Sequence, residues 1–225
     1  MPSYSGIWTL QQQMQAKAQS LWPVPPPPVI GSVYGGGYFA GQISTAGNGV
    51  ADYNLVVGPV ASAQAGTTLQ WKTTDTSTPG TTSVINGPAN SAAMNDASHP
   101  AAQFCEGLTI GGYSDWYMPA KNELEVCYYN LKPTTTSNFT TSGTNTNAVP
   151  SRGSNYTAGN PAQTSVIAFQ SGGVEAFAST NNYWVSTEYS GITTYGWRQG
   201  FNYGNQGGGA KSNSYRVRAI RRVAV

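Results

Sequence analysis

Apolar residues recur at steps of three and four near the start of the chain, which predicts a short helix over residues 5–21. Ser5 stands where a hydroxyl can cap the first free N–H groups. The apolar stripe is thin, and a helix of this length is unstable alone in water. We therefore expect residues 1–22 to be an anchoring peptide that is ordered by docking on another protein. The side chains expected to make that contact are Ile7, Trp8, Leu10, Met14, Leu21 and Trp22.

Prolines dominate the next stretch, residues 23–28. Consecutive prolines adopt an extended polyproline II conformation and act as semi-rigid spacers. We therefore predict a linker over residues 23–28 that separates the anchoring peptide from one domain of residues 29–225. In the alternative interpretation, the helix packs back onto its own domain.

Short runs of strand-forming residues, bounded by glycine and proline, follow from residue 29. They predict strands over residues 38–43, 53–60, 166–169, 183–186 and 215–225. The three glycines at 35–37 predict a hairpin or bulge, and those at 207–209 predict a turn or flexible tip.

Two stretches between these runs have helical periodicity. The first opens with Pro100, a favourable first helical residue, and its shared face comprises Ala101, Phe104, Cys105 and Leu108. The second opens with Pro119, and its buried stripe comprises Leu124, Cys127, Tyr128 and Leu131. Residues 90–97 can add a preceding turn of helix.

The charged fraction is low: 9% of the residues are Asp, Glu, Lys or Arg, against about 25% in ordinary soluble proteins. Hydroxyl and amide groups must therefore solvate the surface, which suits an extracellular or particle-bound protein. A net charge of +2 argues against a nucleic-acid partner, because such a partner requires a basic patch. No apolar run reaches 18 residues, so we expect no membrane insertion. Residues 1–22 lack the features of a signal peptide, so we expect export inside an assembled particle.

The residues that usually perform catalysis are scarce, and we expect no enzyme and no cofactor. A nucleophile needs an adjacent base, and the only histidine, His99, directly precedes Pro100, where a local role at a helix start is expected. Glycoside hydrolysis needs two carboxylates that flank the scissile bond. Nothing in the spacing of the acidic candidates selects a pair. These candidates are Asp115, Glu123, Glu125, Glu175 and Glu188.

The two cysteines, Cys105 and Cys127, are interpreted as buried thiols, with a single disulfide as the alternative. Together with one histidine they make a poor zinc site, since structural zinc takes four ligands, and no metal site is predicted. A calcium site built from loop oxygen atoms remains an open alternative.

Residues 134–164 form a long polar stretch with a single charge, Arg152. A structureless loop of this length is unusual inside a compact domain. We interpret it as a functional loop or as one that contacts a partner.

Seven aromatic residues lie between positions 183 and 203. Trp184 and Phe201 are assigned to the core because they have strand-like surroundings. Tyr189, Tyr195, Trp197 and Tyr203 lie among Gly, Ser, Thr and Asn, a composition typical of binding loops. Sugar rings stack on aromatic faces and bond to amides. In the alternative, these aromatics fill the core or a subunit interface. The predicted glycan or partner face comprises Tyr189, Tyr195, Trp197, Arg198, Asn202, Tyr203 and Asn205.

Residues 111–125, 183–188 and 215–221, taken in this order, resemble a family of bacterial and phage surface domains related to the C-terminal domain of a collagen-like adhesin. The resemblance covers roughly residues 31–225. It implies an α+β, C-type-lectin-like fold, with two helices packed on small antiparallel sheets and long irregular loops.

Within this fold we expect Trp116 in the core beneath the second helix, and Asp115 bonded to nearby backbone amides. Glu188 is expected to accept hydrogen bonds from backbone amides or to pair with an arginine near the C-terminus. The arginines considered are Arg218, Arg221 and Arg222.

Residues 5–15, with Trp22 and Pro23, also look like peptides at the start of phage structural proteins. Together the two resemblances imply a bacteriophage virion protein, a tail-fibre or receptor-binding component that attaches to other virion proteins through residues 1–28. Its expected ligand is host cell-surface polysaccharide, and a homo-oligomer such as a trimer is expected. Two alternatives remain: a capsid decoration or tail or baseplate joint with purely structural contacts, and a bacterial cell-surface lectin.

Overall fold

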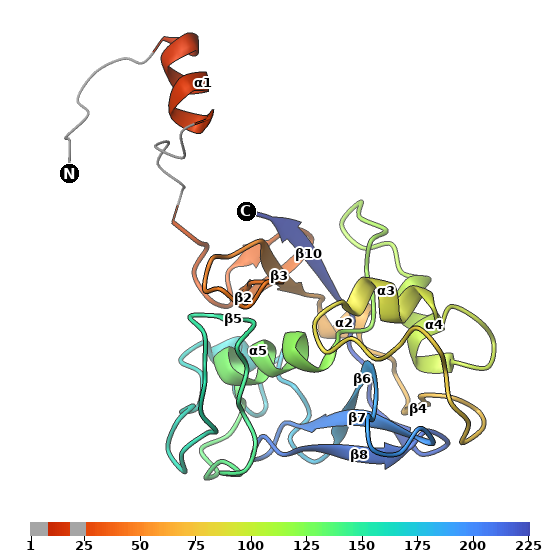
Figure 1. The fold of residues 1–225 in the computed structure, drawn as a ribbon. Coiled ribbons are helices and arrows are strands. Elements are labelled where there is room, and N and C mark those ends of the chain that lie inside the picture. The colour runs from red at the N-terminus through yellow and green to blue at the C-terminus, as the bar shows by residue number, and fades with distance from the viewer. Residues whose placement is uncertain (1–8, 19–25) are drawn as a thin grey trace.

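The computed structural model describes residues 9–18 and 26–225 and contains both helices and antiparallel sheets (Figure 1). The helices are α1 (Leu10–Ala18), α2 (Val60–Ala63), α3 (Gly87–Ala92), α4 (Pro100–Glu106), α5 (Lys121–Leu131) and the 3₁₀ helix η1 (Ile167–Phe169). The strands are β1 (Val33–Tyr34), β2 (Gly37–Ile43), β3 (Tyr53–Val57), β4 (Leu69–Gln70), β5 (Ala148–Val149), β6 (Asn182–Glu188), β7 (Tyr195–Gly200), β8 (Gln206–Ala210), β9 (Ser214–Tyr215) and β10 (Ile220–Ala224).

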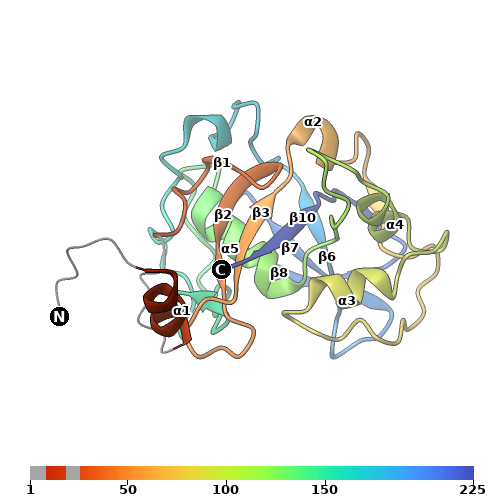
Figure 2. The same ribbon diagram turned by 90° about the horizontal axis from the view of Figure 1, so that it is seen from above.

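The largest sheet has the order β1-β2-β3-β10, with β5 paired to the far end of β2. Figure 2 shows β2, β3 and β10 side by side, with the C-terminus at the end of β10. Gly35 and Gly36 have φ angles of 55° and 85°, a region that favours glycine, and they form the hairpin between β1 and β2. The predicted hairpin and the predicted strands at 38–43 and 53–60 are confirmed, except that the second strand ends at Val57.

Helix α5 lies between this sheet and the sheet β6-β7-β8 (Figure 1). It begins two residues after Pro119, and the Glu123 carboxylate accepts a hydrogen bond of 2.7 Å from the Ala120 N–H at its start. All four residues of the predicted stripe are buried. Their cluster forms the larger core, together with Phe169, Phe177, Tyr183 and Phe201.

A second apolar cluster surrounds Trp71, Trp116 and Trp184 and includes residues of α2 and α4. Trp116 is buried as predicted, but its predicted position beneath α5 is wrong. Residues 116–118 are extended, and Tyr117 forms a bridge to Ile220 of β10. Successive side chains of an extended segment point to opposite sides, so Tyr117 enters the α5 core while Trp116 enters the second cluster.

Three other segment predictions need correction. Residues 167–169 form η1 rather than a strand, and the buried Phe169 ring supplies the apolar signal there. Residues 207–209 lie inside β8 rather than in a turn or flexible tip. The helix predicted at 90–97 is α3, which begins at Gly87 because the Asn86 side chain accepts a hydrogen bond from the Ala89 N–H.

The C-terminal run is confirmed in part. Residues 215–225 form the end of β9 and all of β10, separated by irregular backbone at 216–219.

Helix α1 lies within the helix predicted at 5–21, and Leu10 and Met14 are 73% and 66% exposed. Figure 1 shows α1 apart from the globular part of the described chain. The predicted contacts at Ile7, Trp8, Leu21 and Trp22, and the first half of the linker, lie outside the described residues. Among the residues described, no helix is long and apolar enough to cross a membrane.

Candidate functional site

Five ion pairs take up the five carboxylates that sequence reasoning considered for acid–base chemistry. Each joins segments far apart in the chain, and four of the five carboxylates are buried. The pairs are Asp115–Arg221, Glu123–Arg222, Glu125–Arg152, Glu175–Arg218 and Glu188–Lys211. A buried carboxylate stays charged only when it is paired and hydrogen-bonded, so these residues act here as cross-links.

Two of these carboxylates have an ion-pair partner that the sequence did not assign to them. Glu188 pairs with Lys211 rather than with an arginine near the C-terminus, because Lys211 directly follows β8 in the sheet that contains Glu188. The predicted backbone bond is present: the Thr78 N–H donates to Glu188 at 2.6 Å. Asp115 accepts two hydrogen bonds from Arg221, at 2.7 and 2.9 Å, and its own backbone N–H adds the local backbone bond that the sequence predicted.

The described arginines differ in how many of their nitrogen atoms donate a hydrogen bond to the described residues. A guanidinium carries five N–H groups. Arg218 and Arg221 each donate through all three nitrogen atoms. Arg152 and Arg198 each donate one hydrogen bond within the described chain, and the Nε of each is buried without an acceptor. A buried donor without an acceptor costs about 1–3 kcal/mol, and such groups call for an explanation.

Arg198 lines a polar pocket of about 210 Å³, here named the amide pocket. It lies between the start of β6, the middle of β7 and the turn from β7 to β8. The Arg198 Nη1 donates to Asn182 at 2.7 Å, and Gly204, with a φ of 80°, allows the turn. The lining residues are Thr180, Asn181, Asn182, Arg198, Asn202, Tyr203 and Asn205.

The predicted seven-residue face separates into two groups. Arg198, Asn202, Tyr203 and Asn205 line the amide pocket, whereas Tyr189, Tyr195 and Trp197 do not. Trp197 and Arg198 are neighbours in β7, and neighbouring side chains of a strand point to opposite faces. A single continuous face is therefore excluded.

The second group packs on the other side of the sheet. The Tyr189 and Trp197 rings lie 4.5 Å apart, and the Lys121 ammonium lies 5.0 Å from the Trp197 ring. Both tyrosine rings of the group lie beside Gly208. Trp184 and Phe201, which were assigned to the core, are fully buried.

Sequence reasoning missed the contribution of residues 180–182 to the pocket. Asn181 and Asn182 stand directly before the predicted strand at 183, and pairing of that strand with β7 brings them beside Arg198. Two adjacent asparagines at a strand start were a usable signal, but the strand pairing could not be read from the sequence.

The polar loop (residues 134–164) forms a second polar pocket of about 210 Å³, here named the loop pocket. Buried Asn138, Asn145 and Tyr156 fix this loop to the domain. The loop pocket is lined by Tyr129, Ser151, Arg152, Gly153, Ser154, Asn155, Tyr156 and Asn160.

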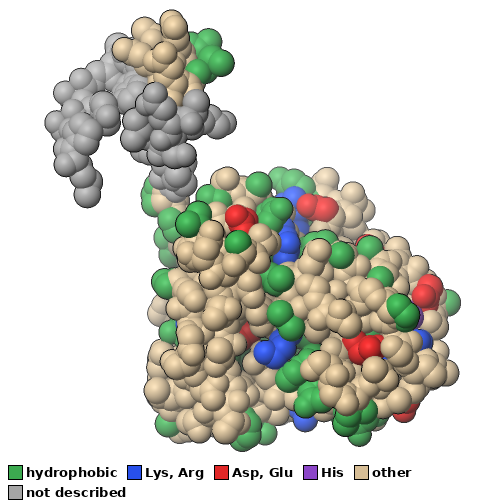
Figure 3. All heavy atoms as spheres, in the orientation of Figure 1, with side chains coloured by type: hydrophobic (Ala, Val, Ile, Leu, Met, Phe, Trp, Pro, Cys, Tyr) green, Lys and Arg blue, Asp and Glu red, His purple; other side chains and the backbone are tan. Residues whose placement is uncertain are grey.

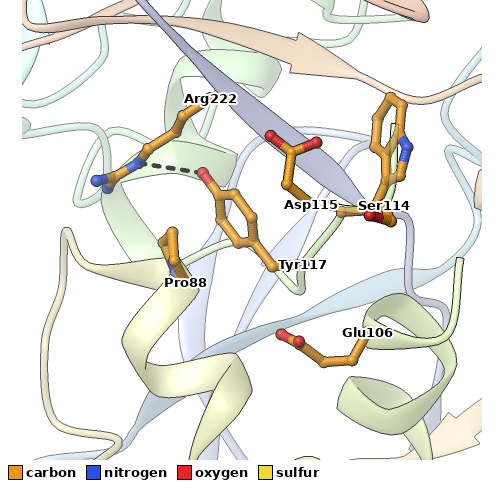
Figure 4. A pocket seen from close by; sticks show the side chains of 7 residues that line it. Pro88, Glu106, Ser114, Asp115, Tyr117 and Arg222 are labelled. Atoms are coloured by element: carbon orange, nitrogen blue, oxygen red, sulfur yellow. Dashed lines mark hydrogen bonds between the residues drawn. The ribbon is translucent and has the colours of Figure 1, made fainter. Parts of the chain in front are cut away.

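A third hollow, of about 210 Å³, lies among α3, α4 and β10 (Figure 4). Glu106 enters it from the end of α4, and it is the one carboxylate with no hydrogen bond or ion pair to the described residues. In Figure 4 the Asp115 carboxylate points toward β10 and not toward Glu106. The picture therefore shows no convergent pair of carboxylates in this hollow.

His99 has the local role that the sequence predicted, at the start of α4. Its Nδ1 lies 2.9 Å from Asp96, and its Nε2 lies 3.1 Å from the Thr78 hydroxyl. These three residues have the order of a hydrolase triad, but Thr78 is only 4% exposed, which closes its hydroxyl to a substrate.

Both cysteines are free and buried, and they belong to different apolar clusters, which confirms the interpretation as buried thiols. Burial raises the pKa of the Cys127 thiol to about 12. In the part of the chain that the structure describes, no three His, Cys, Asp or Glu side chains gather in a group that could hold a metal ion.

A model of one protein family, described as the Lcl C-terminal domain, matches residues 63–221. None of the curated proteins matches the chain. The matched range includes the segments 111–125, 183–188 and 215–221 on which the resemblance to adhesin domains was based, and it contains the amide pocket and the loop pocket. Since the match covers more than two thirds of the sequence, the chain belongs to the Lcl C-terminal domain family.

Proposed function

We propose that this chain is an adhesion component of a bacteriophage particle, which binds host cell-surface polysaccharide through the amide pocket. Residues 1–22 attach it to other virion proteins, residues 23–28 space it from the particle, and residues 29–225 form a C-type-lectin-like domain. The two helices α4 and α5, the small antiparallel sheets and the long polar loop support this finer fold assignment.

The observation that carries the proposal is the composition of the amide pocket. Four asparagines and Arg198 line it, together with Tyr203, and its residues include no acid. Amides both donate and accept hydrogen bonds, as sugar hydroxyls do. Arg198 donates one of its five N–H groups to the residues that the structure describes, so further donors are available when its side chain adjusts to a ligand.

The wider surface also suits adhesion. Figure 3 shows a face with few charged side chains, on which hydroxyl and amide groups predominate. Five of the nine carboxylates are held in ion pairs with Lys or Arg, which supports a function in binding rather than in acid–base catalysis.

A glycan array probed with the full chain tests the proposed ligand class. We expect binding to bacterial surface polysaccharides that falls at least about tenfold in Arg198→Ala, because a hydrogen bond to a charged group contributes about 1.5–3 kcal/mol. Trp197→Ala is the matched control, since it alters the same strand outside the pocket. Equal binding by both variants and the parent, or no binding to any glycan, contradicts the proposal.

The attachment through residues 1–22 is supported by α1. Leu10 and Met14 lie one turn apart and are both largely exposed, so the helix has an apolar pair available for another protein. Deletion of residues 1–22 should release the protein from the particle without lowering its melting temperature. A truncated protein that melts earlier would show that the helix belongs to the domain.

A second candidate function is a structural joint or capsid decoration, for which Ile167 and Val174 are the favourable observation. These apolar side chains are 79% and 80% exposed, and a neighbouring subunit, including one in a homo-oligomer, would cover them. Imaging of the intact particle separates the candidates: an adhesin has its amide pocket open to solvent, whereas a joint has it covered by another chain.

A further inference from the structure

The loop pocket is formed by different segments of the chain from those that form the amide pocket. Tyr129 of α5 provides one wall, and residues 151–160 of the polar loop provide the rest. The Tyr129 hydroxyl contacts the Asn160 side-chain amide at 3.2–3.3 Å, which closes the wall across the loop.

The loop around this pocket is held rigidly. The Tyr156 hydroxyl donates to the buried Glu125 carboxylate at 2.8 Å, and Asn145 donates to the same carboxylate at 2.5 Å. Gly143, with a φ of 108°, lies against the Tyr156 ring, where a Cβ would be 2.2 Å from the ring. A pocket fixed in this way loses little conformational freedom when a ligand enters.

Arg152 lines the pocket with N–H groups that have no acceptor among the described residues, and its positive charge is already paired. Its guanidinium lies 4.0 Å from the Tyr129 ring centroid, and its positive charge is offset by an ion pair with Glu125. This ion pair accounts for one of its five N–H groups. The other lining residues carry no charge, so an ionic ligand would find no counter-charge.

We propose that the loop pocket is a binding subsite for one neutral sugar residue. Ser151, Ser154 and Asn155 offer hydroxyl and amide groups, and Arg152 offers N–H donors to the ring hydroxyls. The volume of about 210 Å³ is several times the roughly 30 Å³ of a water molecule. It is below the roughly 300 Å³ of the smallest drug-sized sites, so it suits a single ring. The proposal rests on the proposed adhesion function and gives it a second contact with the polysaccharide.

NMR spectroscopy of the ¹⁵N-labelled full chain tests this subsite, since it resolves the Arg152 Nε–H and the Asn155 amide. The probes are the methyl glycosides of glucose, galactose, mannose and N-acetylglucosamine. We expect at least one to shift both signals saturably, with a Kd of about 1 mM for so small a ligand. Asn155→Ala should weaken the shift of the Arg152 Nε–H several-fold, whereas Arg198→Ala, in the amide pocket, should leave that shift unchanged.

The possible outcomes separate the two proposals. The subsite is overturned if no probe shifts the signals of the loop pocket at about ten times the expected Kd. It is also overturned if the Arg152 Nε–H responds equally in Asn155→Ala and in the parent. If Asn181 and Asn182 respond while the loop pocket is silent, the subsite is wrong and the proposed function stands. A response at Arg152 and Asn155 with a silent amide pocket supports the subsite and contradicts the amide pocket as the principal site.

Discussion

Lys211 Nζ lies 2.5 Å from Glu188 Oε2, and both side chains are buried at the end of the β6-β7-β8 sheet. The lysine also donates to the Thr76 carbonyl at 2.9 Å and lies 4.3 Å from the Trp71 ring. Glu188 accepts a backbone bond from Thr78. The ion pair thus attaches the loop that precedes α3 to the sheet.

Removal of the lysine alone should therefore be costly. We expect Lys211→Ala to lower the free energy of unfolding by about 3–5 kcal/mol, because it leaves the Glu188 carboxylate buried without its counter-charge. The double variant Lys211→Met with Glu188→Gln removes both charges and should recover at least half of this loss. Urea denaturation of both variants and the parent measures the difference. A loss below about 1 kcal/mol in Lys211→Ala would mean that the pair is hydrated in solution.

Local patterns predicted much of this fold from the sequence. The stripe of α5, the Gly35–Gly36 hairpin and the cores of β2 and β6 depend on neighbours within a few positions, and each was identified. Burial of Trp184 and Phe201 followed from their strand-like surroundings. These features are encoded by periodicity and turn chemistry.

Features that depend on strand pairing could not be predicted. Glu188 contacts Lys211, which lies 23 positions further along the chain, because β6, β7 and β8 pair in one sheet. The candidate site was half identified for the same reason: its asparagines at 181 and 182 reach Arg198 only through pairing of β6 with β7. Side chains alternate between the two faces of β7, so Trp197 and Arg198 lie on opposite faces of the sheet. This could be recognised only once β7 was known to begin at Tyr195.

The glycines at 207–209 were predicted as a turn or flexible tip, yet they are residues of β8, and Gly208 and Gly209 lie against aromatic rings. A Cβ at Gly208 would lie 2.9 Å from the Tyr189 ring and 3.0 Å from the Tyr195 ring. We expect Gly208→Ala to destabilise the fold by about 1–3 kcal/mol, because the rings must shift from their packed positions. Thermal unfolding followed by circular dichroism measures this change.

Gly207→Ala is the matched control, since the nearest atom to its Cβ would be an Arg198 nitrogen at 4.0 Å. This variant should change stability by no more than about 0.5 kcal/mol. If the two substitutions destabilise the protein equally, backbone freedom rather than ring packing explains why glycine occupies these positions of β8.

The two buried thiols should be unreactive in the native protein. Burial raises the pKa of Cys127 to about 12 and that of Cys105 well above its ordinary value. At pH 8 the thiolate fraction of Cys127 is then about 1 in 10,000, so iodoacetamide should label neither residue until the protein is unfolded. Mass spectrometry of native and urea-treated samples measures the labelling. Rapid native labelling, or a disulfide in the untreated protein, would contradict the burial of these side chains.

The Asp115–Arg221 pair gives the protein an acid-dependent contribution to stability. Two hydrogen bonds from the Arg221 guanidinium hold the pKa of the Asp115 carboxyl below its ordinary value of 3.8. Because the folded-state pKa is the lower one, the contribution is complete above the unfolded-state value and is lost as the pH falls through the folded-state value. Asp115→Asn should therefore lower the free energy of unfolding at pH 7. It should make no difference at a pH below the folded-state pKa of Asp115.

Solvent limits the size of this effect, since the Asp115 side chain is 56% exposed. We expect Asp115→Asn to cost about 0.5–1 kcal/mol at pH 7, the upper part of the range for exposed pairs. Urea unfolding at intervals from pH 7 down to pH 2 should show the difference from the parent shrinking below about pH 4. Glu106→Gln serves as the control at pH 7, where it should change stability little, because Glu106 has no ion pair in the described chain to lose. A difference between Asp115→Asn and the parent that persists undiminished at the lowest pH would show that the charge of Asp115 is not the source of the stabilisation.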